Sequence, residues 1–307
     1  RHKDRGIWQT WTWREVYDDV RAIAQGLIKL GVRQGDKIAI VGANRPMLYW
    51  TLCAAQMLRA TPVPVYADAV ADEMAYVLEN ADVKVAAAQD QEQVDKLLAI
   101  QERLPTLQHI VYDEDRGLRD YTQPNLTALS DLMEFGAKAL ASEAALGRSL
   151  DAMIDAGRAD DASIMLYTSG TTGRSKGVVL AAGRSVQAAR DTVAFDGLTE
   201  RDEQLAYLPL AWVGDHYLNY AQAMVAGSCV ACPENADTVQ QDLREIGPSF
   251  YFAPPRVFES LLTSVQIRME DAGKFKQRMF NHFMDVAKRC GGDILDGKQV
   301  SSGDRFQ

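Results

Sequence analysis

Hydroxyl-bearing residues and glycines surround one lysine near the middle of this 307-residue chain, in the run TSGTTGRSKG at 168–177. Glycines allow a backbone to bring its N–H groups close to a ligand, because no Cβ atom stands in the way. Hydroxyl groups add donors that can rotate, and a lysine adds a compact positive charge suited to phosphate. The sequence therefore predicts a phosphate-binding loop. The residues expected to bind the phosphates are Thr168, Ser169, Gly170, Thr171, Thr172, Gly173, Lys176 and Gly177.

Apolar residues flank this run on both sides. Residues 162–167 have the composition of a short buried strand, and residues 177–180 are apolar enough for another. We therefore expect a strand–loop–strand element whose backbone amides point at an anion. The simplest alternative is a flexible Gly/Ser/Thr loop that binds nothing.

The spacing of the run excludes two common nucleotide-binding motifs. A G-x-x-x-x-G-K-[ST] loop counted from Gly170 needs Gly at 175 and Ser or Thr at 177, but this chain has Ser175 and Gly177. A G-x-G-x-x-G motif is also absent, because Gly170 and Gly173 have no third glycine in register.

The run resembles the signature loop of the adenylate-forming enzymes, which include acyl-CoA synthetases, luciferases and adenylation domains of peptide synthetases. That signature is T-S-G-T-T-G followed by x-P-K-G, and Ser175 stands where the family usually has Pro. The resemblance implies that the hydroxyl groups and Lys176 hold the β- and γ-phosphates of ATP. It also implies that the three glycines let the loop close over the phosphates and open again.

Strands and helices alternate on the N-terminal side of the loop. Thr12 and Glu15 predict a capping box that opens a helix, and Gly31 predicts its end. Strands are expected at 37–41, 62–66, 83–88 and 109–113, and helices at 47–60, 72–80, 92–102 and 129–146. This order predicts an α/β fold with a mostly parallel sheet and helices on both faces. Residues 12–46 resemble the opening of a long-chain fatty acyl-CoA synthetase.

The resemblance implies stacked βαβ subdomains of the adenylate-forming N-terminal domain. We expect a first α/β subdomain at 1–158 and an incomplete subdomain with the phosphate loop and the acyl pocket at 159–307. The family's Y-G-x-T-E segment, its ribose-binding acid, its hinge and its C-terminal domain with a catalytic lysine have no counterpart here. The resemblance therefore implies that the chain is the N-terminal part of an enzyme, inactive alone and without a catalytic residue of its own.

Two residues after the loop are candidates for the substrate pocket. Residues 205–212 resemble a family segment that ends at the acyl pocket, where relatives often carry L-P-L-A-H and this chain has Trp212. An indole there could form a wall of a hydrocarbon tunnel. His216 could reach the same region if residues 213–226 are helical. The alternatives are an ordinary buried tryptophan and a structural histidine.

A further segment points to the long-chain branch of the family. Residues 248–261 resemble the family's A-V-P-R-V-W-E segment, with Pro254 and Phe258 as departures. The pattern predicts a buried strand that leads into a helix initiated by proline, with Arg256 in its first turn. Arg256 is equally suited to a structural ion pair and to ligand contact.

Charge and cysteine content narrow the class of protein. The net charge is −9 and no Lys/Arg cluster alternates with aromatic residues, which argues against nucleic-acid binding. No apolar run has the roughly 18 residues of a membrane span. Cys229 and Cys232 have C-x-x-C spacing but lie in an apolar, strand-like run with no second pair, so no metal ligands are predicted and all four cysteines are expected as thiols. We expect a cytoplasmic protein, and an enzyme for lipid acids also allows peripheral membrane contact.

For the complete enzyme, the resemblance implies activation of a long-chain fatty acid in two steps. ATP converts the acid to an acyl-adenylate with release of pyrophosphate, and coenzyme A then forms the thioester. ATP, Mg²⁺ and coenzyme A are the implied cofactors and co-substrates, and relatives often form homodimers. Three alternatives stay open: a synthetase for medium-chain or aromatic acids, a phosphotransferase with a convergent loop, and a non-catalytic module that binds acyl groups or nucleotides.

Overall fold

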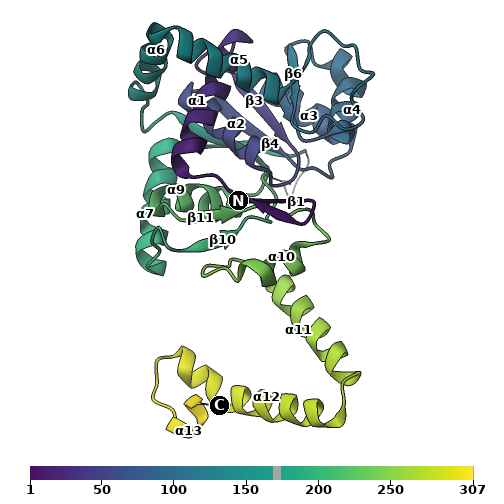
Figure 1. Ribbon diagram of the computed structural model, residues 1–307, viewed down its shortest axis with the longest axis vertical. Coiled ribbons are helices and arrows are strands. Elements are labelled where there is room, and N and C mark those ends of the chain that lie inside the picture. The colour runs from purple at the N-terminus through teal and green to yellow at the C-terminus, as the bar shows by residue number, and fades with distance from the viewer. Residues whose placement is uncertain (169–173, 307) are drawn as a thin grey trace. The chain divides into compact units, whose positions relative to one another are not determined.

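The computed structural model describes residues 1–168 and 174–306. The chain forms two compact units, Arg1–Tyr251 and Phe252–Gln307. The expected boundary between 158 and 159 falls inside the first unit, between the last turn of one helix and the next strand, and it stays a prediction. Figure 1 shows the elements in chain order.

A five-stranded parallel sheet forms the centre of the first unit (Figure 1). In spatial order the strands are β4 (Thr61–Val65), β3 (Lys37–Val41), β5 (Val83–Ala88), β6 (His109–Tyr112) and β7 (Leu126–Ala128). Four of them lie within one residue of the bounds expected from the sequence. The mostly parallel α/β architecture is thus confirmed.

Helices cover both faces of this sheet, and each face has its own apolar core. The helices are α1 (Trp13–Lys29), α2 (Pro46–Met57), α3 (Ala71–Ala81), α4 (Gln91–Ile100), the 3₁₀ turn η1 (Gln101–Arg103), α5 (Leu129–Ser142) and α6 (Ala144–Asp155). Side chains of α1, α2 and α5 pack against Ile38, Ile40 and Val85 on one face. Side chains of α3 and α4 pack against Ala39, Val41 and Ala86 on the other. Alternate residues of β3 therefore enter opposite cores, as the pleat of a strand requires.

The beginning of α1 confirms the predicted capping box. The N–H of Glu15 donates to Thr12 Oγ1 at 3.3 Å, and the N–H of Thr12 donates to Glu15 Oε2 at 2.7 Å. The single helix expected at 129–146 is instead two helices, because Glu143 adopts an extended conformation between α5 and α6. This break turns α6 so that its Leu150 enters the core shared by α1 and α2.

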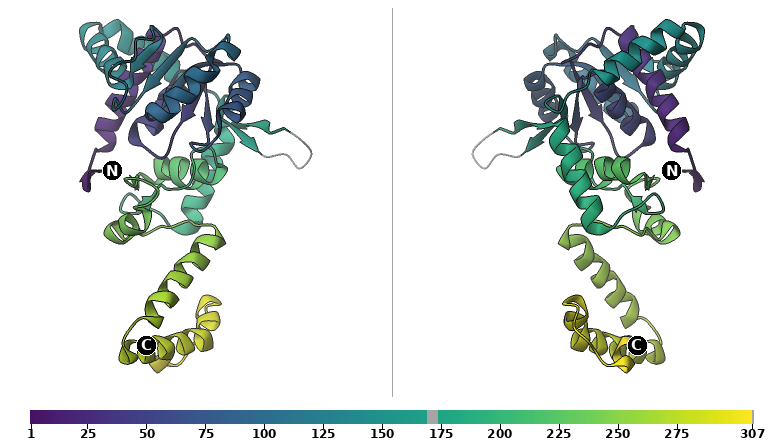
Figure 2. Two further views of the ribbon diagram at one scale, coloured as in Figure 1. Left: turned by 90° about the vertical axis from the view of Figure 1, so that its right-hand side faces the viewer. Right: turned by 90° about the vertical axis from the view of Figure 1, so that its left-hand side faces the viewer.

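The predicted strand–loop–strand element is a two-stranded antiparallel hairpin. Its strands are β8 (Ala162–Thr168) and β9 (Lys176–Ala181), and it extends from the body of the unit (Figure 2). β8 lies against β4, the edge strand of the central sheet. The backbone N–H of Thr61 donates to the backbone oxygen of Asp36, just before β3. Because the N–H groups of successive residues in a strand point to opposite sides, Pro62 and Pro64 stand at positions that face away from β3. Proline has no N–H, so this outer edge of β4 lacks two hydrogen-bond donors. The hairpin therefore packs beside the sheet as a separate pair of strands.

Short elements complete the first unit. They are β1 (His2–Asp4), β2 (Ile7–Gln9), α7 (Ala182–Asp196), β10 (Glu203–Leu205), α8 (Val213–Asp215), the π-helical turn η2 (His216–Ala221), α9 (Gln222–Ala226), β11 (Cys229–Ala231) and α10 (Val239–Ile246). The expected helix at 213–226 is confirmed as the continuous series α8, η2 and α9. Its π turn was not expected.

The second unit consists of helices. They are α11 (Pro255–Glu270), α12 (Lys274–Leu295) and α13 (Ser302–Phe306). The helix initiated by proline is confirmed, with Arg256 in its first turn. The strand expected before it is wrong, because Phe250 makes only an isolated bridge to Gln204. Within the described residues, no helix combines the length and the apolar character needed to cross a bilayer.

Candidate functional site

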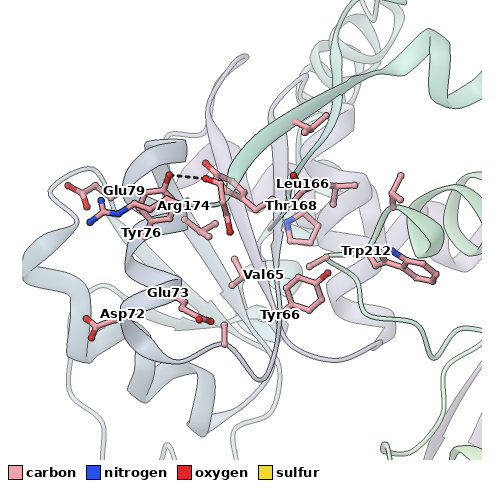
Figure 3. Close-up of a pocket in the computed structure, with 18 of the residues that line it drawn as sticks. Val65, Tyr66, Asp72, Glu73, Tyr76, Glu79, Leu166, Thr168, Arg174 and Trp212 are labelled. Atoms are coloured by element: carbon pink, nitrogen blue, oxygen red, sulfur yellow. Dashed lines mark hydrogen bonds between the residues drawn. The ribbon is translucent and has the colours of Figure 1, made fainter. Parts of the chain in front are cut away.

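A cavity of about 1110 Å³ adjoins the β8–β9 hairpin (Figure 3). Its walls come from β8 and β9, from α3, from the turn after β4 and from the segment that precedes α8. Thr168 and Ser175 line it together with Trp212, which follows them by more than 35 residues in the chain. One cavity thus adjoins both the end of the predicted phosphate loop and Trp212.

One face of the hairpin forms a wall of this cavity. Leu166 pairs with Val178, and Thr168 pairs with Lys176. Because residues that pair directly in an antiparallel ladder project to the same face, Lys176 emerges beside Thr168 on the face that contains the cavity-lining Leu166 and Val178. The lysine and the threonine expected to bind phosphate are therefore neighbours across the two strands.

Gly177 is required by close packing on the opposite face of the hairpin. A Cβ atom at this position would lie 2.2 Å from Met165 Cε and 3.1 Å from Tyr167 Cζ. Real Cβ atoms do not approach other atoms so closely. A larger residue at 177 would therefore push aside the end of the Met165 side chain and crowd the Tyr167 ring.

Two tyrosines attach the hairpin to α3. The hydroxyl of Tyr167 donates to Asn80 Oδ1 at 2.7 Å, and the hydroxyl of Tyr76 donates to the backbone oxygen of Ser175 at 2.8 Å. Burial is the main reason that the pKa of Tyr167 rises to about 12, so its hydroxyl stays protonated and can donate. These contacts hold the end of β8 and the residues before β9 in place.

The charges of the cavity are distributed unevenly. Asp72, Glu73 and Glu79 lie on the side formed by α3, as Figure 3 shows. Arg174 stacks on Tyr76, with its guanidinium carbon 5.2 Å from the ring centroid. Lys176 is exposed and, within residues 1–168 and 174–306, forms no ion pair. An anion would therefore be attracted to the hairpin end of the cavity and repelled by α3.

The remaining predicted site residues fall into two groups, those outside the described part of the chain and those within it. Ser169, Gly170, Thr171, Thr172 and Gly173 lie outside the described residues. Trp212 lines the cavity beside the hairpin. Its assigned role there stays a prediction.

His216 does not line this cavity, although it follows Trp212 by four residues. It is buried and faces a separate cavity of about 490 Å³. Its Nε2 is hydrogen-bonded to Ser163 Oγ at 3.1 Å and to Ser185 Oγ at 3.4 Å. Burial lowers the pKa of His216 to about 4, so the imidazole is neutral at physiological pH. Its role as a substrate-pocket residue stays a prediction, and it would concern a cavity that Trp212 does not share.

A buried carboxyl group next to His216 was missed by the sequence analysis. Asp215 Oδ1 accepts hydrogen bonds from Tyr49 Oη at 2.8 Å, Asn219 Nδ2 at 2.8 Å and Asn44 Nδ2 at 3.2 Å. Burial nevertheless raises the pKa of Asp215 to about 7. The only signal in the sequence is an aspartate in an apolar helix, which does not reveal partners that are 166 and 171 residues away.

The described part of the chain has no preformed cluster of metal-binding side chains. There, no group of three or more His, Cys, Asp and Glu side chains lies close enough together to hold a metal ion. The acids of α3 do not provide such a group. Because Mg²⁺ is usually bound by one or two carboxylates together with substrate phosphates and water, the Mg²⁺ that the resemblance implies stays a prediction.

Comparisons with known proteins agree over most of the chain. The family model described as "AMP-binding enzyme" matches residues 2–300. The long-chain-fatty-acid–CoA ligase ACSBG1 of Rattus norvegicus is 25% identical over 293 residues, covering 93% of this chain and 39% of the rat protein. The long-chain-fatty-acid–CoA ligase FadD15 of Mycobacterium bovis is 29% identical over 273 residues, covering 88% of this chain and 43% of that protein.

Solved structures share the fold at lower sequence identity. The long-chain-fatty-acid–CoA ligase FadD1 of Archaeoglobus fulgidus superposes with a TM-score of 0.69 at 17% identity, over 89% of this chain and 50% of that one. ATP-bound MatB of Rhodopseudomonas palustris gives a TM-score of 0.60 at 21% identity, over 75% of this chain and 42% of that one. This chain thus spans less than half the length of its curated relatives.

Proposed function

The chain belongs to the AMP-binding enzyme family, and from this premise we propose that it is part of an AMP-forming fatty acid–CoA ligase for long-chain acids. The family membership supports activation of a carboxylate by ATP. The names of the rat and mycobacterial relatives support a long-chain fatty acid as the substrate. Coenzyme A is the proposed acceptor of the acyl group.

The observation that carries the proposal is the register of the hairpin. Thr168 and Lys176 project side by side on the face of the hairpin that lines the large cavity, and Trp212 lines the same cavity. A hydroxyl group and an unpaired ammonium group at one end suit the phosphates of a nucleotide. An indole in the wall suits an apolar chain. One cavity would then bring the acid and the nucleotide together.

The proposed first step forms a bond between a carboxylate oxygen and the α-phosphorus of ATP, and the bond to the pyrophosphate oxygen breaks. Negative charge develops on the leaving pyrophosphate. Lys176 and Thr168 are proposed to stabilise that charge by a point charge and a hydrogen bond held in place before the reaction. Residues 169–173, which lie outside the described part, remain in this proposal as further donors. In the second step the thiolate of coenzyme A displaces AMP from the acyl-adenylate.

Carboxylate-dependent exchange of pyrophosphate into ATP tests this function in the intact protein. The acids would range from acetate through long-chain fatty acids to aromatic acids. We expect exchange that rises with chain length and is lost without acid. Maximal exchange with a medium-chain or aromatic acid would assign the runner-up substrate class. ADP as the product would indicate a phosphotransferase, and folded protein without exchange would favour a binding module.

The cellular setting is also part of the proposal. We place the enzyme in the cytoplasm, in peripheral contact with membranes from which long-chain acids are drawn, and as a homodimer. Sedimentation with lipid vesicles tests the membrane contact, and analytical ultracentrifugation tests the oligomeric state. Failure of either leaves the adenylation chemistry unaffected, because the exchange assay measures it separately.

A further inference from the structure

A second cavity, of about 400 Å³, lies in the first unit and shares no lining residue with the cavity of the candidate site. It lies between the start of α1, one side of α2, the helix η2–α9 and strand β11. Figure 1 shows that α1, α9 and β11 approach one another near the N-terminus. Nothing in the proposed adenylation chemistry uses this cavity.

Its walls are mainly aromatic and aliphatic. They include Trp11, Trp13, Val16, Val20, Pro46, Tyr49, Trp50, Cys53, Met224 and Val230. Trp11 and Trp50 meet edge to face with ring centroids 5.4 Å apart. The indole N–H of Trp13 donates to the backbone oxygen of Gly227 at 3.0 Å, which fixes that ring as well. The walls are therefore held in shape without a ligand, as small-molecule sites usually are.

Ser228 is the exceptional polar residue of this cavity. It is only 2% exposed, and its hydroxyl has no hydrogen-bond partner among the residues that the structure describes. A buried hydroxyl without a partner lowers stability, because it loses its hydrogen bonds to water and gains none. The hydroxyl is thus available to a molecule that enters the cavity.

The charged groups that line the cavity are already engaged with the protein. The Arg1 guanidinium pairs with Glu203 at 2.8 Å, the backbone nitrogen of Arg1 donates to the backbone oxygen of Val230 at 2.7 Å, and Glu200 lies 4.0 Å from Arg201. A charged ligand would therefore lose its hydration without gaining a free counter-ion. An apolar cavity of about 150 Å³ can hold benzene, so simple scaling gives this one room for at most roughly 16 carbon atoms.

We propose that this cavity binds a neutral, mainly apolar molecule that carries one hydroxyl or carbonyl oxygen, with Ser228 as its hydrogen-bond partner. An aliphatic alcohol is the simplest member of this class. The site differs from the one that would take a carboxylate substrate, because within residues 1–168 and 174–306 both cationic groups of Arg1 that could meet a carboxylate are already engaged, the guanidinium with Glu203 and the backbone nitrogen with the Val230 oxygen.

Titration calorimetry of the intact protein with 1-octanol and with octanoate at neutral pH tests the proposal. We expect 1-octanol to bind at least tenfold more tightly than octanoate at this site. Binding should also change the tryptophan fluorescence, because three indoles line the cavity. Equal binding of the two probes, or no binding of 1-octanol, would overturn the proposal.

Ser228→Ala separates a ligand-binding hydroxyl from a structural one. Removing one hydrogen bond should weaken 1-octanol binding about three- to tenfold. The melting temperature of the unliganded protein should stay the same or rise, since an unsatisfied buried group is removed. A lower melting temperature would show that the hydroxyl already has a partner, and unchanged binding would show that it does not contact the ligand. Either result contradicts the proposal.

A matched pair of substitutions tests the location of the site. Val16 is a half-buried wall of this cavity and of neither of the other two, so Val16→Trp should reduce the cavity and should weaken 1-octanol binding at least tenfold. Ile7 is 65% exposed and lines none of the three cavities described here, so Ile7→Trp should bind like the parent protein. Equal effects of the two substitutions would place the binding elsewhere. Binding of 1-octanol is measured separately from acid-dependent pyrophosphate exchange, which tests the function of the cavity beside the hairpin.

Discussion

Lys176 keeps its ammonium group in solvent at the start of β9, opposite Thr168. No carboxylate in the described part of the chain pairs with it. A cation that is held near a cavity without a partner contributes little to the stability of the fold. Its charge is therefore available to an anionic ligand.

Lys176→Ala should slow acid-dependent adenylation by roughly 100-fold, the usual cost of removing one group that stabilises developing charge. The melting temperature should not change, because the side chain makes no ion pair in the described part of the protein. Arg201→Ala is the matched control, since Arg201 is an exposed cation that lines none of the three described cavities. Initial rates of pyrophosphate exchange measure both. If the two variants exchange pyrophosphate at equal rates, Lys176 does not act at the phosphate site.

Unlike the exposed Lys176, Asp215 is buried, and its carboxyl group accepts hydrogen bonds from Tyr49, Asn44 and Asn219. Its pKa of about 7 in the folded protein lies above the ordinary aspartate value of 3.8. Below pH 4 the carboxyl is protonated in both states. Between pH 4 and 7 it ionises only in the unfolded chain, so the unfolded state gains stability as the pH rises. The folded protein should therefore lose up to about 4 kcal/mol from this group between pH 4 and 7.

Asp215→Asn should remove this loss, because an amide does not ionise. The difference in unfolding free energy between the variant and the parent should grow in favour of the variant from pH 4 to 7 and then stay constant. His216 and His2, whose pKa values burial lowers to about 4, act in the opposite direction and are common to both proteins. Denaturant titrations at pH 4.5, 6 and 7.5 measure the difference. Parallel curves for the two proteins would show that Asp215 does not titrate in this window.

Helices α1 and α5 approach each other closely at two glycines. A Cβ atom at Gly136 would lie 1.9 Å from the backbone oxygen of Ala22, and one at Gly26 would lie 2.5 Å from Leu132 Cγ. Backbone oxygens cannot move as a flexible side chain can. The crossing of the two helices therefore depends on glycine at both positions.

Gly136→Ala should destabilise the protein by about 1–3 kcal/mol, the usual cost of overpacking, despite the better helix propensity of alanine. Gly147→Ala in α6 is the control, because its Cβ would have only Arg21 Nη2 nearby, at 3.8 Å. The free energy of unfolding of Gly147→Ala should equal that of the parent protein or be slightly higher. Thermal unfolding compares them. Similar melting temperatures for the two variants would show that α1 and α5 can separate at little cost.

Elements with strong local signals were predictable from the sequence. The capping box at Thr12, four of the five strands of the central sheet and the two strands of the hairpin depend on short-range patterns, and these predictions are confirmed, whereas β7 was not predicted. The break at Glu143 and the π turn at 216–221 have no local signal, since neither contains Pro or Gly. They arise from packing against distant helices. For the same reason the sequence could suggest that His216 shares a pocket with Trp212, whereas the structure points it into another cavity.

At the scale of the whole molecule, the two units differ in how much core they have. Two apolar clusters support Arg1–Tyr251. In the described part of Phe252–Gln307, only Val286 and Cys290 are buried. Apolar side chains such as Phe275 and Leu295 are 75% and 90% exposed there. Burial of so few side chains supplies little hydrophobic free energy to offset the loss of chain entropy.

Residues 252–307 produced alone should therefore melt gradually, whereas residues 1–251 should unfold in one cooperative transition. Circular dichroism during heating and urea titration measures both pieces. The intact chain serves as the reference for the transition of the first unit. A sharp transition of the short piece would show that its helices form a stable core by themselves.

Pro62 and Pro64 have a consequence for self-association. An edge strand with free N–H groups can recruit a strand from another molecule and start a cross-β aggregate. β4 lacks two of the donors that such an addition would use on its outward side. While the chain folds, this edge is thus protected even before β8 covers it. A homodimer of the protein would not be built by joining two central sheets at β4, and would have to use another surface.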